Sequence, residues 1–136
     1  MERVRFRLLL CFMFLAFAAF LQPYRPVVVV GNSMWPTLRS GTVVILDTRA
    51  RCGANINEGD IVVVRIDGQN LVKRVYALGG SKVRGFLGRD ETKYSKRTYR
   101  VPDGYLLVIG DNRQDSYDSR DFGPVPIEAV LGKILS

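Results

Sequence analysis

Hydrophobic positions along the chain follow two patterns, and the change comes near residue 25. Residues 8–21 are almost wholly apolar (LLLCFMFLAFAAFL), whereas the later apolar residues occur in short β-branched runs separated by Gly, Pro, Asn and Asp. Such runs are typical of strands, and after residue 25 no stretch of about 12 residues has a convincing helical period. The pattern predicts one N-terminal helix followed by an all-β domain.

The first segment is predicted to insert into a membrane. Arg3, Arg5 and Arg7 precede the uncharged stretch 8–24, and the positive end would stay inside. As a helix this stretch would be about 25 Å long, slightly shorter than a hydrocarbon core of about 30 Å. A cleavable signal peptide, with a small-residue site at 16–18, fits the segment equally well, and a buried core helix fits it less well. Either inserted form places the later residues outside the cytoplasm.

The remaining residues predict mostly antiparallel sheets in one compact domain, so we expect an anchor over 1–24 and a β domain over 25–136. A two-residue turn at 67–68 predicts a hairpin, and residues 81–100 are expected to form a small excursion with one hairpin. The first two apolar runs are continuous, which is typical of strands buried on both faces. The main strands are expected at 27–30, 42–46, 61–66, 71–78, 105–109 and 129–135.

The composition excludes several catalytic mechanisms and metal sites. The chain of 136 residues has no histidine, which excludes a Ser-His-Asp triad, a Cys-His pair and an H-E-x-x-H zinc site. Its two cysteines cannot build a Cys-rich zinc site or a disulfide framework. We therefore expect neither a metal nor a cofactor.

The chain is basic, with a formal net charge of +7. Residues 1–22 hold three Arg and one Glu, so +5 remains on the predicted β domain. The basic residues are scattered, with no run longer than two and no aromatic platform beside them, which disfavours nucleic acid as a partner. A solvated basic face resting on anionic lipid headgroups is the expectation.

Three segments carry candidate chemistry, although each taken alone is an ordinary structural feature. Residues 31–38 (GNSMWPTL) have the composition of a turn, and residues 110–126 (GDNRQDSYDSRDFGPVP) that of a polar loop. In residues 71–75 (LVKRV), strand alternation places Lys73 on the same face as its apolar second neighbours. A lone lysine in such a strand usually protects an edge or extends to water.

Together the segments are more specific. S-M-x-P-T at 33–37, V-K-R-V at 72–75 and G-D-N-R-x-x-S-x-D-S-R at 110–120 occur in the order found in type I signal peptidases, and the G-D-I-V at 59–62 also fits. The chain resembles this family over nearly its whole length. The resemblance implies a serine endopeptidase that removes N-terminal signal peptides from exported preproteins. It also implies an uncleaved transmembrane helix, a single pass of the cell (inner) membrane, and an extracytoplasmic catalytic domain in contact with the lipid bilayer.

The resemblance assigns the catalytic roles to a Ser-Lys dyad. Ser33 would attack the scissile carbonyl to form an acyl-enzyme, and Lys73 would act as the general base. Without histidine, a lysine can serve only if desolvation keeps its amine neutral, and Leu71 and Val75 supply apolar neighbours for that. The backbone N–H of Ser33 would donate to the oxyanion beside Gly31, where some members of the family carry a serine.

Further roles follow from matching positions. By the resemblance, Ser116 orients the lysine, and Asp118 forms an ion pair with Arg120 that supports the loop. Because the two lie two positions apart in sequence, an extended segment would place both side chains on one face. The residues implied to line the pockets for small side chains at −1 and −3 are Met34, Leu38, Leu71 and Val72, for each of which ordinary core packing is nearly as good an account.

The chain departs from the family after the lysine segment. Residues 77–81 read ALGGS, where a G-x-P-G-D turn is usual, and only about twenty residues separate Gly80 from Val101. Larger members insert an accessory β domain at this place, so we expect a minimal catalytic core.

Other functions stay open. Related Ser-Lys proteases with narrow substrates include the mitochondrial inner-membrane, conjugative-transfer and self-cleaving repressor types, and Arg113 and the anchor favour the bacterial export type among them. A non-catalytic, membrane-tethered β domain that binds peptides or nucleic acid is a candidate of a different class, and the joint presence of Ser33, Lys73 and Ser116 argues against it. An aspartic protease would have to use Asp47, whose loop lacks the glycine that lets it close tightly.

Overall fold

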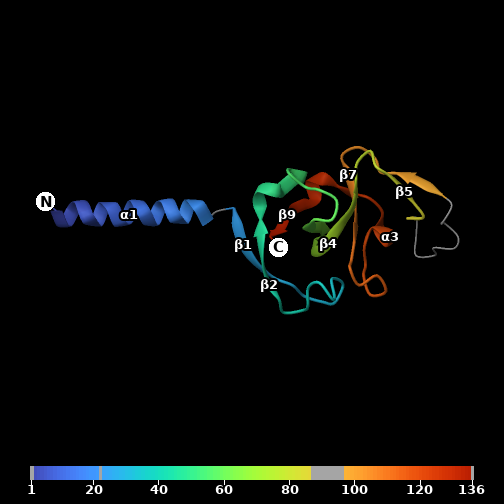
Figure 1. Ribbon diagram of the computed structural model, residues 1–136, viewed down its shortest axis with the longest axis horizontal. Coiled ribbons are helices and arrows are strands. Elements are labelled where there is room, and N and C mark those ends of the chain that lie inside the picture. The colour runs from blue at the N-terminus through green and yellow to red at the C-terminus, as the bar shows by residue number, and fades with distance from the viewer. Residues whose placement is uncertain (1, 22, 87–96, 136) are drawn as a thin grey trace.

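The computed structural model describes residues 2–21, 23–86 and 97–135. A helix, α1 (Glu2–Leu21), precedes a β domain built on a seven-stranded antiparallel sheet in the order β1-β2-β9-β3-β4-β7-β8 (Figure 1). The strands of this sheet are β1 (Tyr24–Val28), β2 (Val43–Asp47), β3 (Ile61–Ile66), β4 (Gln69–Leu78), β7 (Tyr105–Ile109), β8 (Val125–Pro126) and β9 (Val130–Leu135). The predicted mostly antiparallel β domain is confirmed.

The smaller elements lie in the connections. A separate antiparallel hairpin pairs β5 (Lys82–Arg84) with β6 (Thr98–Arg100), as expected for the excursion at 81–100, of which residues 87–96 lie outside the described residues. Short helical segments, which the strand pattern did not predict, are η1 (Thr48–Gly53), α3 (Ser119–Phe122) and η2 (Ile127–Ala129).

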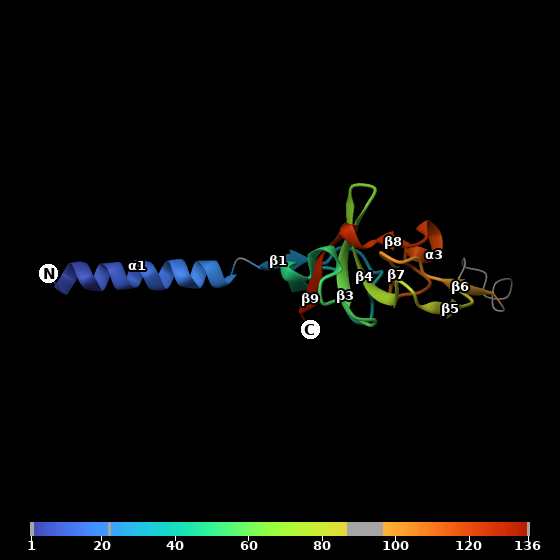
Figure 2. The ribbon, with the colours of Figure 1, turned by 90° about the horizontal axis from the view of Figure 1, so that it is seen from above.

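Helix α1 extends away from the β domain in both views (Figures 1 and 2). Its apolar side chains are exposed, with Phe12 at 71% and Phe14 at 72%. In the described residues, no helix is both long enough and apolar enough to cross a membrane. The expected helix is present, and its membrane attachment stays a prediction.

The central strands bury apolar side chains on both faces of the sheet, because their side chains alternate between two clusters. One cluster contains Val62, Val64, Val75, Leu106, Val108 and Val130, and the other contains Met34, Leu46, Ile61, Val63 and Ile134. This central position holds β4, which carries Lys73, between β3 and β7.

Two sequence expectations meet different outcomes in these strands. The hairpin turn is present, with positive φ at Asp67 (47°) and Gly68 (78°), as a tight turn between β3 and β4 requires. The expectation that the first two strands are buried on both faces is wrong: Val28 in β1 and Val43 in β2 are 58% and 62% exposed. The reason is that β1 is an edge strand and these paired residues point to a face that no described element covers.

Leu106→Ala should lower the free energy of unfolding by about 2–5 kcal/mol, since it leaves a cavity where a fully buried leucine packs in β7. Urea titration of the detergent-solubilised chain measures this. The same substitution at Leu135, which is 46% exposed at the end of β9, should cost much less. Equal losses at the two positions would contradict the assignment of the core.

Candidate active site

Ser33 lies in the loop that connects β1 to β2, and its backbone is tied to a distant segment. The Asn112 N–H donates to the Ser33 carbonyl at 3.0 Å, and the Asn112 side-chain amide donates to the Asn32 carbonyl at 3.2 Å. The next residue, Met34, is buried in the core cluster with Leu46 and Ile61. The serine is therefore held from one side by a buried side chain and from the other by the loop after β7.

Lys73 comes from the middle of β4, and its Nζ lies 2.7 Å from the Ser33 Oγ. Lys73 is only 3% exposed. It lies beside Val62, with which it pairs in the neighbouring strand β3, and its side chain is on the same face of β4 as that of Val75. Burial lowers the pKa of the Lys73 amine, because an ammonium loses hydration there, and the negative charge of Asp118 acts in the opposite direction. The two side chains meet although they lie 40 positions apart in sequence.

Asp118 is fully buried and ionised. Its carboxylate accepts from Arg120 Nε at 2.9 Å and Nη2 at 2.8 Å, and from the Gly110 N–H at 3.0 Å. Burial raises its pKa, but these donors, with the Ser116 hydroxyl, outweigh burial and lower the pKa to about 2. The buried Ser116 hydroxyl thus helps to lower the pKa of Asp118. The charge of this carboxylate in turn raises the pKa of Lys73.

The Asp118–Arg120 ion pair is present, but its local geometry differs from the sequence expectation. The segment is not extended: Asp118 caps the N-terminus of α3, and Arg120 lies in that helix's first turn. Asp121 completes a capping box by accepting from the Asp118 N–H at 3.0 Å. A helix start, and not strand alternation, brings the two charges together.

Gly110 makes the close approach between these segments possible. A Cβ at this position would lie 2.1 Å from the Ser116 Oγ and 2.5 Å from the Ser33 carbonyl oxygen. Both distances are too short for any Cβ atom. The glycine of G-D-N is therefore needed for contact between the serine loop and the loop after β7.

A second ion pair was missed by reasoning from the sequence. Arg74 donates to both carboxylate oxygens of Asp111, at 2.8 and 2.6 Å, and to the Gly59 carbonyl at 2.7 Å. The Thr37 hydroxyl also contributes to lowering the pKa of Asp111. The available signal was that Arg74 and Asp111 adjoin the lysine and glycine of their motifs. This bidentate pair joins β4 to the loop after β7.

The predicted pocket residues are brought together only in part. Met34, Leu38 and Val72 belong to one apolar cluster, whereas Leu71 packs against the cluster on the opposite face of the sheet. Gly31 has a φ of +90° with open space where a Cβ would be, and its N–H donates to the Ser40 Oγ at 3.2 Å. A side chain at position 31 would therefore cost backbone strain and would meet no clash.

The residue considered for aspartic proteolysis is held by structural contacts. Asp47 caps η1 and is bound by Arg49, whose side-chain hydrogen bond lowers the pKa of this carboxyl, so it is committed to structure. Within residues 2–21, 23–86 and 97–135, no group of three Cys, Asp or Glu side chains is placed to hold a metal ion.

Comparison with protein families now gives the context of this geometry. The family model described as "Signal peptidase, peptidase S26" matches residues 2–89 and 84–136. The chain belongs to the S26 signal peptidase family. The members of this family are serine proteases. The three motifs of the sequence lie within the matched residues.

Relatives come from two cellular settings. The chain is 37% identical over 111 residues to mitochondrial inner membrane protease subunit 1 of Xenopus tropicalis, an alignment covering 79% of this chain and 65% of that protein. It is 33% identical over 137 residues to signal peptidase I of Bacillus caldolyticus, with 79% and 75% covered. The chain thus spans a little under two thirds of the mitochondrial relative's length.

A solved structure is also similar. The crystal structure of a signal peptidase I from Enterococcus faecalis V583 matches with a TM-score of 0.47 and 26% identity, covering 60% of this chain and 97% of that one.

Asp118→Asn should remove a pH-dependent part of the stability. Since folding lowers the pKa of Asp118 from 3.8 to about 2, the carboxylate contributes about 2 kcal/mol that is present above pH 4 or so and lost as the pH falls towards about 2. Urea unfolding between pH 2 and 7 should therefore show a flatter pH dependence for the variant. Asp115→Asn, at an exposed position of the same loop, should keep the wild-type slope; an unchanged slope in Asp118→Asn would contradict the assignment.

Proposed function

We propose that the chain is a membrane-anchored endopeptidase that uses Ser33 and Lys73 to cleave signal peptides from preproteins. The observation that carries the proposal is the 2.7 Å distance between Lys73 Nζ and Ser33 Oγ at a buried position. In a chain without histidine, this pair supplies both a nucleophile and a base.

In the first step, the neutral amine of Lys73 takes the Ser33 hydroxyl proton while Oγ attacks the scissile carbonyl carbon. The developing oxyanion accepts from the Ser33 N–H, and the lysine then gives its proton to the leaving amine. In the second step, Lys73 takes a proton from water, whose oxygen attacks the ester. Collapse of this intermediate breaks the bond to Ser33 Oγ, which takes the proton back from Lys73, and frees the signal peptide with a new carboxyl terminus.

The surrounding groups position the base. The charge of Asp118 acts on Lys73, the Ser116 hydroxyl donates to this carboxylate, and Arg120 forms an ion pair with it. Asp118 and Arg120 are positioning residues in this proposal, and Ser116 orients the lysine amine. Leu38 and Val72, which are half-buried in one apolar cluster with the buried Met34, stay the candidates for contact with small side chains at −1 and −3.

Membrane attachment is the second half of the proposal. Exposed apolar side chains over α1 and three arginines near its start support a single-pass anchor with the β domain on the extracytoplasmic side. Only ten residues separate position 22 from Ser33, so the nucleophile would lie near the bilayer surface, where signal peptides present their cleavage sites.

A narrow-substrate protease of the mitochondrial inner-membrane type is the second candidate. It is favoured by the similarity to subunit 1 of that protease in Xenopus tropicalis, Mus musculus and Homo sapiens, at 34–37% identity. The two candidates share the dyad and differ in substrate. Incubating the chain with a panel of bacterial preproteins and mitochondrial intermembrane-space precursors separates them.

Lys73→Arg should be nearly inactive, because the guanidinium cannot deprotonate to act as a base. We expect kcat/KM on a peptide with Ala at −1 and −3 to fall by about 10²–10⁴, as for other losses of a general base, and Ser33→Ala to be at least as damaging. Lys82→Arg makes the same change at an exposed position and should keep wild-type activity. Substantial turnover by folded Lys73→Arg would refute the dyad.

The pH profile of the same reaction reports the state of Lys73. Since burial lowers its pKa, kcat/KM should rise with pH and level off below the usual range of lysine. Asp118→Asn removes a charge that raises this pKa, so its rising limb should move to lower pH. A limb unmoved by the substitution would contradict the positioning role of Asp118.

Deletion of residues 1–22 should lower cleavage of membrane-bound preproteins much more than cleavage of a soluble peptide, because the anchor brings the site to the bilayer. Both rates are measured on the same preparations, with circular dichroism to check folding. Mass spectrometry of the purified full chain should find residues 1–22 attached. A mature start near Ala19 would show instead that the segment is a cleaved signal peptide.

A further inference from the structure

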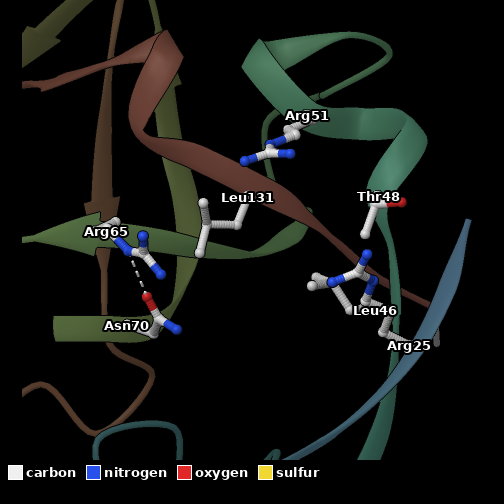
Figure 3. A pocket seen from close by; sticks show the side chains of 7 residues that line it. All are labelled: Arg25, Leu46, Thr48, Arg51, Arg65, Asn70 and Leu131. Carbon is white, nitrogen blue, oxygen red and sulfur yellow. Dashed lines mark hydrogen bonds between the residues drawn. The ribbon is translucent and has the colours of Figure 1, made fainter. Parts of the chain in front are cut away.

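Three arginine side chains converge on a cavity that the proposed chemistry does not use. Arg25 comes from β1, Arg51 from η1 and Arg65 from β3, and Figure 3 shows their guanidinium groups directed towards the space between them. The cavity has a volume of about 390 Å³, at the lower end of the range of about 300–1,000 Å³ for ligand pockets. Three strands or helices that are separate in sequence thus contribute one cation each.

The positive charge of the cavity is not balanced locally. Among the residues that the structure describes, none of the three guanidinium groups forms an ion pair. Arg65 Nε donates to the Asn70 side-chain oxygen at 3.1 Å, which fixes this guanidinium beside the cavity. Three guanidinium groups around one space repel each other and favour an anion with several acceptor oxygens.

The floor of the cavity is apolar. Leu46 and Leu131, from β2 and β9, lie between the arginines (Figure 3), and Thr48 also lines the cavity, although its hydroxyl donates to the Pro23 carbonyl. A cationic rim over an apolar floor suits a ligand with a charged head and a hydrocarbon part.

The position of the cavity indicates which ligand this is. Arg25 is the second residue of β1, directly after the connection from α1. Thr48 is bound to the same connection, because its N–H and hydroxyl donate to the Pro23 carbonyl at 2.7 and 2.9 Å. The cavity therefore lies where the helix leaves the β domain, which is the headgroup level of a bilayer if α1 is the anchor.

We propose that this cavity binds the phosphate of an anionic phospholipid headgroup. The inference rests on the membrane attachment in the proposed function. The guanidinium groups of Arg25, Arg51 and Arg65 would donate to the phosphate oxygens, and the leucine floor would receive the glycerol backbone. Such a contact orients the β domain on the membrane at the point where its chain enters.

The test uses the full chain carrying Ser33→Ala in a neutral detergent, titrated with phosphatidylglycerol in mixed micelles and followed by the 31P resonance of the lipid. We expect saturable binding of one lipid per chain. Arg25→Gln combined with Arg65→Gln should weaken it roughly tenfold or more, since two charge-assisted contacts are lost. Arg51→Gln alone should give a smaller loss in the same direction.

The matched control combines Arg84→Gln with Arg100→Gln, which removes the same charge from exposed positions on the two strands of the β5–β6 hairpin. It should leave binding within about twofold of wild type, because this hairpin lies at the end of the β domain away from β1 (Figure 1) and salt screens exposed charges. Equal losses in the control and the cavity variant would show diffuse attraction and overturn the proposal. Circular dichroism establishes that each variant is folded.

Other ligands are distinguished in the same titration. Phosphatidylcholine that binds as tightly as phosphatidylglycerol would overturn the anionic selectivity, and inorganic phosphate that does so would show a soluble-anion site and overturn the lipid assignment. A glutamate-rich peptide that displaces the lipid at equimolar concentration would assign the cavity to an acidic polypeptide instead. The proposal is supported if phosphatidylcholine, inorganic phosphate and the glutamate-rich peptide all bind weakly or not at all.

Failure of this inference and failure of the proposed function give different results. Lipid binding is measured without Ser33, so it does not depend on peptidase chemistry. If peptide cleavage by the unsubstituted chain is intact and the lipid does not bind, only the lipid site is wrong. If the lipid binds and the peptide is not cleaved, only the Ser-Lys chemistry is wrong.

Discussion

The buried carboxylate of Asp118 is the constraint on which the rest of the site depends. A buried charge is tolerated only when donors satisfy it, and here Arg120, the Gly110 N–H and the Ser116 hydroxyl do so. The same contacts fold the loop after β7 back on itself, since Asp118 also caps α3. Gly110 is thereby held where its missing side chain leaves room for the Ser33 carbonyl. Removal of either ionic partner would leave an uncompensated charge in the interior.

Two opposing influences set the state of Lys73. Burial lowers the pKa of its amine and is the larger influence, while Asp118 raises it. Arg120 forms an ion pair with Asp118, and the paired carboxylate therefore attracts the Lys73 ammonium less strongly. The proposed base therefore becomes neutral more readily than an exposed lysine, at a position where its nitrogen already contacts the nucleophile.

Strand β1 connects the two functional proposals. It begins beside the arginine cavity and leads directly into the loop of Ser33, with seven residues between Arg25 and the serine. On the proposed membrane attachment, a headgroup bound at one end of this strand would set the height of the nucleophile at the other. The Arg74–Asp111 pair then fixes β4, which carries Lys73, to the loop after β7, so the dyad does not depend on β1 alone.

By itself the sequence determined the local features whose cause is local: the long apolar helix, the strands over 61–66 and 105–109, the turn at 67–68, and the motifs that hold Ser33 and Lys73. Period, turn residues and the absence of histidine are readable without any contact. The exposed faces of β1 and β2 were not readable, because the same valines suit a covered or an uncovered sheet face. Nor was the helical turn that joins Asp118 to Arg120, the Arg74–Asp111 pair, or the meeting of three arginines at one cavity. Each of these depends on segments that are brought together only by strand order and packing, which residue patterns along the chain do not specify.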